Sequence, residues 1–121
     1  MKHKTRKELG AIAEEAATNL LRSQGYRIRE RNYRCPSGEI DIVAEHKGDL
    51  VFIEVKARTA TERGQPSEAV GYDKQRRITS AAGSYLAYRV GKQVLCRYDI
   101  VEVLMEKNGH VREMRIFPAA F

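Results

Sequence analysis

Two runs of β-favouring residues, 39–46 and 50–58, constrain the fold more than any other feature of this sequence. The short polar segment 47–49, which contains a glycine, separates them, and this pattern predicts a β-hairpin. Side chains alternate between the faces of a strand, so one face of the hairpin is expected to be apolar and to belong to the core. That face comprises Ile40, Ile42, Ile53 and Val55.

The opposite face of the hairpin is charged, and the pairing register decides which charges meet. A two-residue turn at Lys47 and Gly48 sets Asp41 directly opposite Glu54. Lys56 follows on the same face of its strand. A neighbouring register would instead set Asp41 opposite Lys56. In either register the three charged side chains cluster.

Helical spacing of apolar residues predicts one helix before the hairpin and one after it. Thr5 and Glu8 form a capping-box pair at the start of the first helix, and Gly25 ends it. The second helix is expected over about residues 73–90, with Asp73 as its N-cap.

Three further segments, 26–34, 98–105 and 111–117, predict strands. Because a helix connects the third strand to the fourth, these two strands are expected to be parallel, with a right-handed crossover. We therefore expect an α/β fold with a mixed sheet, formed as one domain by residues 1–121. The segment 59–72 is long for a connection, and long loops often carry function.

Charge is distributed unevenly along the chain. The net charge is +6, and basic residues dominate in segments 1–34 and 73–121, whereas acidic residues dominate in segment 35–72. Basic surfaces attract polyanions such as nucleic acid, and hard cations such as Mg²⁺ need carboxylate oxygens. A charged surface can also serve solubility alone.

The sequence contains neither a long apolar run nor a signal-peptide pattern, so we expect a cytoplasmic protein without a membrane partner. Cys35 and Cys96 lie far apart and belong to no metal-binding pair, which indicates ordinary thiols.

The charged face of the hairpin carries the parts of a metal site. Two carboxylates held close together repel each other unless a cation lies between them. A lysine beside them could orient water and neutralise charge on a phosphate. Asp41, Glu54 and Lys56 thus suffice in outline for phosphodiester hydrolysis with Mg²⁺ or Mn²⁺. The same charges could equally form a salt-bridge ladder on a solvated strand face.

Both helices supply further candidates. Glu14 lies at the border of the apolar stripe of the first helix, where it either reaches the sheet or remains on the surface. Lys74 and Gln75 lie above the apolar face at the start of the second helix, a position that favours a phosphate. Arg76 and Arg77 are expected to point outward, toward solvent or a nucleic-acid backbone.

These motifs resemble those of a known family. The segment GEIDIVAEHKGDLVFIEVKAR (38–58), preceded by Glu14 and Glu15 and by GYRIRERN (25–32), is similar to the YraN-type family of small bacterial proteins. The resemblance covers nearly the whole chain. It implies a restriction-endonuclease-like α-β-β-β-α-β core, with a mixed central sheet flanked by helices, and the PD-(D/E)xK motif of that superfamily.

The resemblance also implies roles for individual residues. Asp41 corresponds to the motif aspartate, Glu54 to the second acid and Lys56 to the lysine. Glu14 corresponds to an auxiliary metal ligand on the first helix, and Gln75 to a polar residue on the following helix.

The function implied is a Mg²⁺- or Mn²⁺-dependent endonuclease, with DNA, including branched or structured DNA, favoured over RNA as the substrate; the sequence leaves the choice between DNA and RNA open. The backbone carbonyl of Val55 is expected to assist in metal binding. The candidates for nucleic-acid contact are Arg27, Arg29, Arg31, Arg34, Lys74, Arg76 and Arg77.

Two alternatives remain open from the sequence. One is a nucleic-acid-binding accessory module on a nuclease fold with little or no catalytic activity. The other is a protein-interaction domain whose basic faces bind an acidic partner, because fold alone does not determine function. Since cutting a duplex needs two nicks and the chain carries one such site, a homodimer is also expected.

Overall fold

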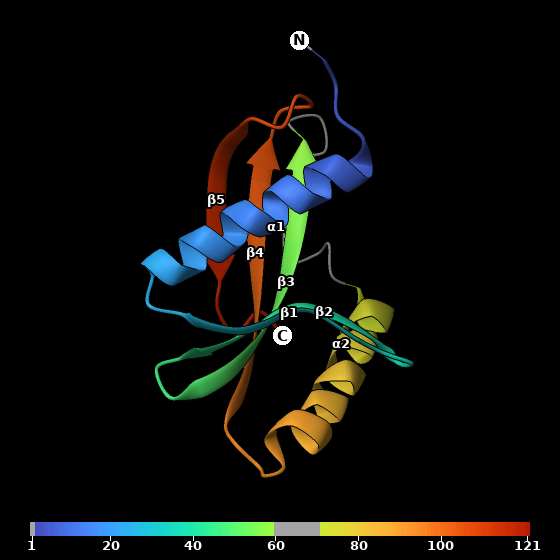
Figure 1. The fold of residues 1–121 in the computed structure, drawn as a ribbon, viewed down its shortest axis with the longest axis vertical. Helices are drawn as coiled ribbons and strands as arrows, with labels where there is room; N and C mark the ends of the chain where they lie inside the picture. The colour runs from blue at the N-terminus through green and yellow to red at the C-terminus, as the bar shows by residue number, and fades with distance from the viewer. Residues whose placement is uncertain (1, 60–70) are drawn as a thin grey trace.

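The computed structural model describes residues 2–59 and 71–121 and has the predicted order of elements (Figure 1). The elements are α1 (Arg6–Ser23), β1 (Arg27–Cys35), β2 (Gly38–His46), β3 (Asp49–Thr59), α2 (Tyr72–Tyr85), the π-helical turn η3 (Leu86–Val90), β4 (Cys96–Met105) and β5 (Val111–Phe117). Most of the segment 59–72, which we expected to be a functional loop, lies outside the described residues.

The five strands form one mixed sheet in the order β1-β2-β3-β4-β5. β3 and β4 are parallel, as the intervening helix predicted, and the other neighbouring strands are antiparallel. This α/β arrangement confirms the predicted fold class.

The β2–β3 hairpin has the first of the two predicted registers. His46 pairs with Asp49, and the last pair is Ile42 with Ile53. Lys47 and Gly48 between the strands have φ angles of 52° and 86°, the left-handed values that a tight hairpin turn requires. The alternative register, with Asp41 opposite Lys56, is therefore wrong.

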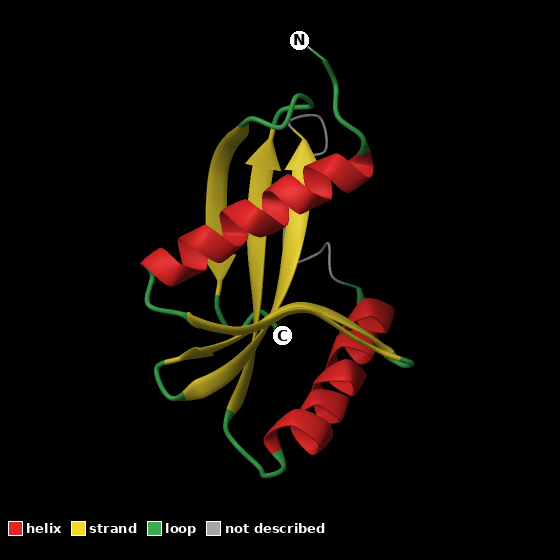
Figure 2. Ribbon diagram, viewed as in Figure 1, coloured by secondary structure: helices red, strands yellow, loops and turns green. Residues whose placement is uncertain are grey.

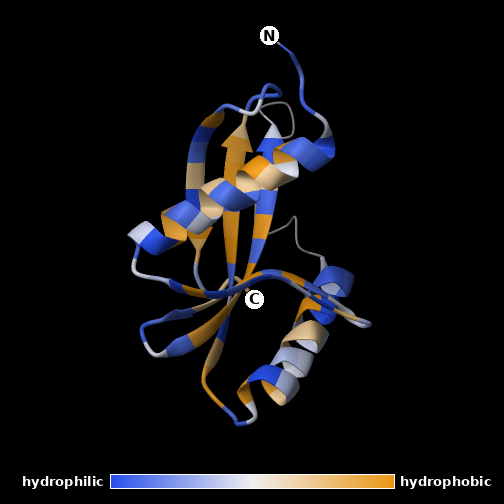
Figure 3. Ribbon diagram, viewed as in Figure 1, coloured by the Kyte–Doolittle hydropathy of each residue, from blue (hydrophilic) through white to orange (hydrophobic). Residues whose placement is uncertain are grey.

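One helix covers each face of the sheet (Figure 2). α1 crosses β3, β4 and β5, where Leu21 packs with Ile53 and Val101 in a buried cluster. The hydrophobic colour in Figure 3 follows β4 beneath this helix. α2 lies against β1 and β2 on the other face, and its Ile78 packs with Phe52.

Ile40 corrects the expectation of one continuous apolar face on the hairpin. Ile42 and Ile53 pack on the α1 side, whereas Ile40 belongs to the cluster beneath α2. β2 pairs with β3 only as far as Ile42, and beyond this point β1 and β2 run together toward α2 (Figure 1). The change of direction turns Ile40 to the other face.

The helix termini agree with the sequence in part. Thr5 and Glu8 form the predicted capping box of α1, and Gly25 after the helix has a φ of 88°. The N-cap of α2 is Gly71, without a side-chain bond. The prediction that Asp73 is the N-cap is therefore wrong. Asp73 lies in the first turn, where its charge still interacts favourably with the helix dipole.

A buried ionic network joins β4 to distant parts of the chain. Asp99, whose side chain is fully buried, accepts hydrogen bonds from the Tyr26 hydroxyl at 2.8 Å and from Arg97 Nε at 2.9 Å. It also accepts one from the backbone N–H of Ala119 at 2.9 Å. The ring of Tyr26 stacks on His46, with 3.8 Å between the ring centroids. The network thus connects the residue before β1, the end of β2, β4 and the C-terminal segment.

Candidate functional site

Asp41 and Glu54 lie at the point where β2 leaves β3. Each is the next residue after the last paired residues of the two strands, Ile42 and Ile53. The backbone N–H of Val55 donates to Asp41 Oδ2 at 2.8 Å, so the carboxylate satisfies an amide beyond the end of the ladder. Glu54 is a buried charged residue, with 6% of its surface exposed. The pairing register therefore brings Asp41 and Glu54 to the end of the ladder. The hydrogen bond from Val55 then orients Asp41 where the two strands separate.

The two acids are close enough to change each other's chemistry. Burial raises the pKa of Asp41, and the hydrogen bond and charge of Glu54 raise it further, to about 9. The N–H of Val55 and the charge of Lys74 act in the opposite direction. Without a cation, the pair thus retains a proton at neutral pH. Two carboxyl groups that compete in this way form an oxygen donor set that suits Mg²⁺ or Mn²⁺.

Lys74 is the lysine that contacts this pair. Its Nζ lies 2.5 Å from Glu54 Oε2. Burial lowers the pKa of Lys74, but the hydrogen bond and charge of Glu54 outweigh burial and raise it overall. The sequence analysis assigned Lys74 to phosphate binding and did not foresee the ion pair. The available signal was its position on the apolar side of α2, four residues before the buried Ile78.

Glu14 faces β1. Its Oε1 accepts hydrogen bonds from Arg31 Nε at 3.0 Å and from Asn32 Nδ2 at 2.9 Å. Asn32 has a left-handed φ of 55°, and the sequence analysis missed it. Within residues 2–59 and 71–121, no three His, Cys, Asp or Glu side chains are arranged to hold a metal ion. Asp41 and Glu54 therefore form a pair that Glu14 does not join in this structure.

The remaining catalytic candidates lie around the pair. Lys56 is partly buried and forms no ion pair with any described residue. It lines a cavity of about 550 Å³ together with Arg6 and other residues of α1 and β3. The side chain of Val55 packs on the α1 side of the sheet. Gln75 is half-buried in the first turn of α2, next to Lys74.

The arginines proposed to contact nucleic acid fall into two groups. Those of β1 have acidic partners: Arg27 and Arg29 lie 4.0 and 3.3 Å from Glu45, Arg31 bonds to Glu14 and Glu15, and Arg34 bonds to Glu39. Those of α2 form no ion pair with the described part of the chain. Arg76 lies over the exposed ring of Tyr72, and Arg77 lines a cavity. Among these arginines of the described chain, those without an ionic partner are therefore on α2.

Known proteins resemble this chain along most of its length. The family model described as "Uncharacterised protein family UPF0102" matches residues 13–103. This chain belongs to the UPF0102 family. The assignment confirms the YraN-type resemblance that the sequence motifs indicated.

Relatives in the UPF0102 family match nearly end to end. A UPF0102 protein of Lachnoclostridium phytofermentans is 49% identical over 93% of this chain and 91% of its own length. One from Moorella thermoacetica is 44% identical, covering 97% and 98%. One from Syntrophotalea carbinolica is 46% identical, covering 96% and 93%. All candidate site residues, from Glu14 to Arg77, lie within the segment that the UPF0102 model matches. Among the described residues, no helix has the length and apolarity needed to cross a membrane.

Proposed function

We propose that this protein is a divalent-metal-dependent endonuclease that hydrolyses phosphodiester bonds in DNA, including branched or structured DNA. The observation that carries the proposal is the contact between the partly buried Asp41 and the buried Glu54, in which burial and then the hydrogen bond and charge of Glu54 raise the pKa of Asp41 to about 9. Two acids held together need a shared proton or a cation to balance them. The ion pair with Lys74 engages Glu54, and a divalent cation would balance both carboxylates. A cation-binding role explains why both groups are acidic.

Asp41 and Glu54 would hold Mg²⁺ or Mn²⁺, with the backbone carbonyl of Val55 as a further oxygen. The bound ion supplies a Lewis acid that neutralises charge on the phosphodiester. The N–H of Val55 fixes the orientation of Asp41. Lys56, which has no described ionic partner, orients the attacking water and donates to a phosphate oxygen. Glu14 can assist only by leaving Arg31 and Asn32.

The nucleic-acid strand would lie along α2. Arg76 and Arg77 are exposed and without acidic partners in the described chain, so they retain their full charge for phosphates. Gln75 would form a hydrogen bond with the nucleic-acid strand close to Lys74. The β1 arginines contribute less because each must exchange a carboxylate for a phosphate. We propose DNA as the strand, with RNA as the comparison in the test.

A cleavage assay tests the activity. The protein is incubated with single-stranded, duplex, flap and four-way-junction DNA and with RNA, each in Mg²⁺ or Mn²⁺, and Glu54→Gln is assayed in parallel. Loss of one metal-binding carboxylate should reduce the rate at least about a hundredfold. Glu113→Gln, at an exposed position on β5, is the matched control and should retain the wild-type rate. Equal cleavage by both variants would contradict the assignment.

A nucleic-acid-binding accessory module is the second candidate, and two contacts favour it. Lys74 neutralises Glu54, and Glu14 is bound to β1, which leaves two acids rather than three at the site. This alternative predicts salt-dependent binding that EDTA does not change and that Lys56→Ala does not weaken. It also predicts no metal-dependent product from correctly folded protein.

Duplex cleavage at one site per chain further suggests a homodimer. Sedimentation at micromolar concentration, with and without duplex DNA, tests this expectation. A monomeric mass in both conditions would contradict it.

A further inference from the structure

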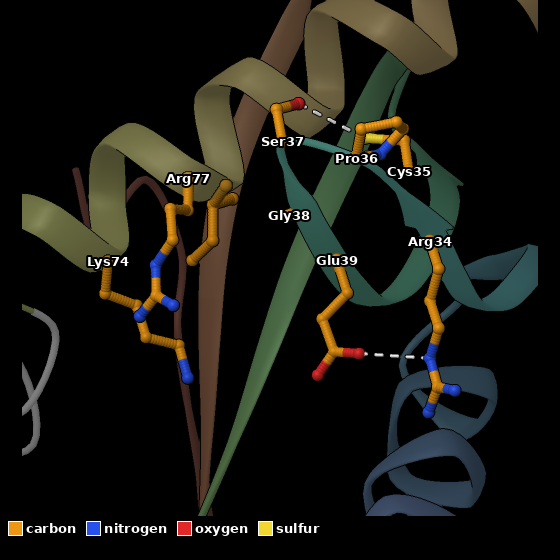
Figure 4. A pocket seen from close by; sticks show the side chains of 9 residues that line it. Arg34, Cys35, Pro36, Ser37, Gly38, Glu39, Lys74 and Arg77 are labelled. Atoms are coloured by element: carbon orange, nitrogen blue, oxygen red, sulfur yellow. Dashed lines mark hydrogen bonds and ion pairs between the residues drawn. The ribbon is translucent and has the colours of Figure 1, made fainter.

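A cavity of about 380 Å³ opens between the β1–β2 turn and α2 (Figure 4). Its charged lining residues are Arg34, Glu39, Lys74 and Arg77. The volume is within the range of sites that hold small ligands. Lys74 joins this cavity to the acid pair, because its ammonium group also contacts Glu54.

The charges on the two walls differ. On the strand wall, Arg34 Nε lies 3.1 Å from Glu39 Oε2, so these charges compensate each other (Figure 4). On the helix wall, Lys74 and Arg77 point into the same space (Figure 4). Lys74 is paired with Glu54, whereas Arg77 has no ionic partner in the described chain. Arg77 therefore supplies an unpaired positive charge on the helix wall of the cavity.

Gly38 fixes the width of the cavity. A Cβ atom at this position would lie 2.7 Å from the backbone oxygen of Arg77, closer than real contacts allow. The β1–β2 turn thus packs directly against the backbone of α2. This contact holds the two walls at a set distance before any ligand arrives.

The cavity does not end at Arg77. Arg77 and Ser37 also line a neighbouring hollow that includes Asp73, Arg76 and Ser80. A strand could enter on one side and leave on the other, which suits an internal phosphate better than a chain end. Arginine matches phosphate oxygens with two parallel N–H donors, and lysine adds a point charge.

We propose that this cavity is a phosphate subsite that takes an internal phosphodiester of the nucleic-acid strand presented to Asp41 and Glu54. The inference deepens the proposed function, on which it rests for the identity of the ligand. Arg77 provides the main contact, and Gly38 keeps the site open at the correct width. The subsite selects which linkage of the strand reaches the acid pair.

The test uses oligonucleotides in which a single neutral methylphosphonate linkage is moved along the strand. Binding is measured by fluorescence anisotropy in EDTA, where no cleavage occurs. Wild-type protein should lose about tenfold in affinity at one or two adjacent positions, the usual effect of removing one charged hydrogen bond. Arg77→Gln should bind the all-phosphate strand about as weakly and should show no further loss at those positions. Arg112→Gln, an exposed arginine on β5, should keep the wild-type profile.

Circular dichroism melting first establishes that Arg77→Gln is folded. A loss spread evenly over all positions, or a positional loss that persists in Arg77→Gln, would overturn the subsite. Dependence on a terminal 5′ phosphate would place a chain end in the cavity and contradict the internal assignment. Because binding is measured without metal, absence of cleavage would defeat the nuclease proposal alone. Cleavage without a positional effect would defeat the subsite alone.

Discussion

Lys74 of α2 forms an ion pair with Glu54 of β3, with 2.5 Å between Nζ and Oε2. The contact brings a cation from the helix to an acid pair that would otherwise carry uncompensated negative charge. It also ties the start of α2 to the end of the β2–β3 ladder. Lys74 thus stands in direct competition with any metal ion at Asp41 and Glu54.

Removing this lysine should strengthen metal binding. In Lys74→Gln, the ammonium group no longer occupies Glu54 or repels a divalent cation, so affinity for Mn²⁺ should rise several-fold. Isothermal titration calorimetry measures the change, with Lys92→Gln as a control at an exposed position beyond α2. Weaker Mn²⁺ binding by Lys74→Gln would show that the lysine supports the metal instead of excluding it.

Asp41 should make the metal-free protein less stable as pH rises. Its pKa is raised from 3.8 to about 9 in the folded protein, so between these values the folded chain holds a proton that the unfolded chain has released. The free energy of unfolding should therefore fall across this window. Asp41→Asn still accepts the bond from Val55 but has no such proton. In EDTA at pH 8 it should be more stable than wild type by at least about 1 kcal/mol.

Urea denaturation at pH 5, 7 and 9 measures this difference, which should widen with pH. The exposed Glu113→Gln variant should instead follow the wild-type pH dependence. A pH dependence of Asp41→Asn identical to wild type would mean that the acid pair shares no proton.

Gly38 and Gly83 should respond oppositely to alanine. At Gly38 a Cβ would meet the Arg77 oxygen at 2.7 Å, so Gly38→Ala should cost about 1–3 kcal/mol of unfolding free energy. Gly83 lies within α2 with open space around its Cα, and Gly83→Ala should stabilise the helix by roughly 0.5–1 kcal/mol. Chemical denaturation of both variants measures the contrast. Equal effects would show that the turn does not pack against α2.

The Asp99 network should contribute strongly to the free energy of unfolding, because it holds β4 to Tyr26 and to the C-terminal segment. Asp99→Ala leaves Arg97 and the Tyr26 hydroxyl without their buried acceptor, which typically costs about 3–5 kcal/mol. Arg115→Ala removes an exposed pair with Glu113 at 4.0 Å and should cost less than about 0.5 kcal/mol. Thermal and urea denaturation compare the two. A small effect of Asp99→Ala would mean that water replaces the network.

The network also lends itself to a titration test. Burial and the hydrogen bond to Asp99 raise the pKa of Tyr26 to about 12. Its phenol should therefore remain protonated up to strongly alkaline pH. Ultraviolet absorbance of the phenolate, compared between wild type and Tyr26→Phe, assigns the late step in the titration.

Local patterns determined the fold and the central pair of the site. The Lys47-Gly48 turn sets the hairpin register, which holds as far as the pair Ile42 and Ile53, and Asp41 and Glu54 are the next residues on the two strands. The helix between β3 and β4 predicts a parallel pair for a similar reason, because parallel neighbours need a long crossover connection and a helix usually supplies it. These features depend on spacing along the chain, which a sequence displays directly.

Tertiary structure alone decided the partners of the other site residues. Ile40 lies on the other face because β2 pairs with β3 only from Ile42 to His46 and bends away before it. Glu14 bonds to Arg31 of β1, the strand that runs beside β2 away from β3. Gly38 lets α2 dock closely on the β1–β2 turn, and from the docked helix Lys74 contacts Glu54. Such contacts depend on the path of a bent strand and the docking of a helix. Both are set by packing between segments that are distant in sequence, and no local spacing encodes them.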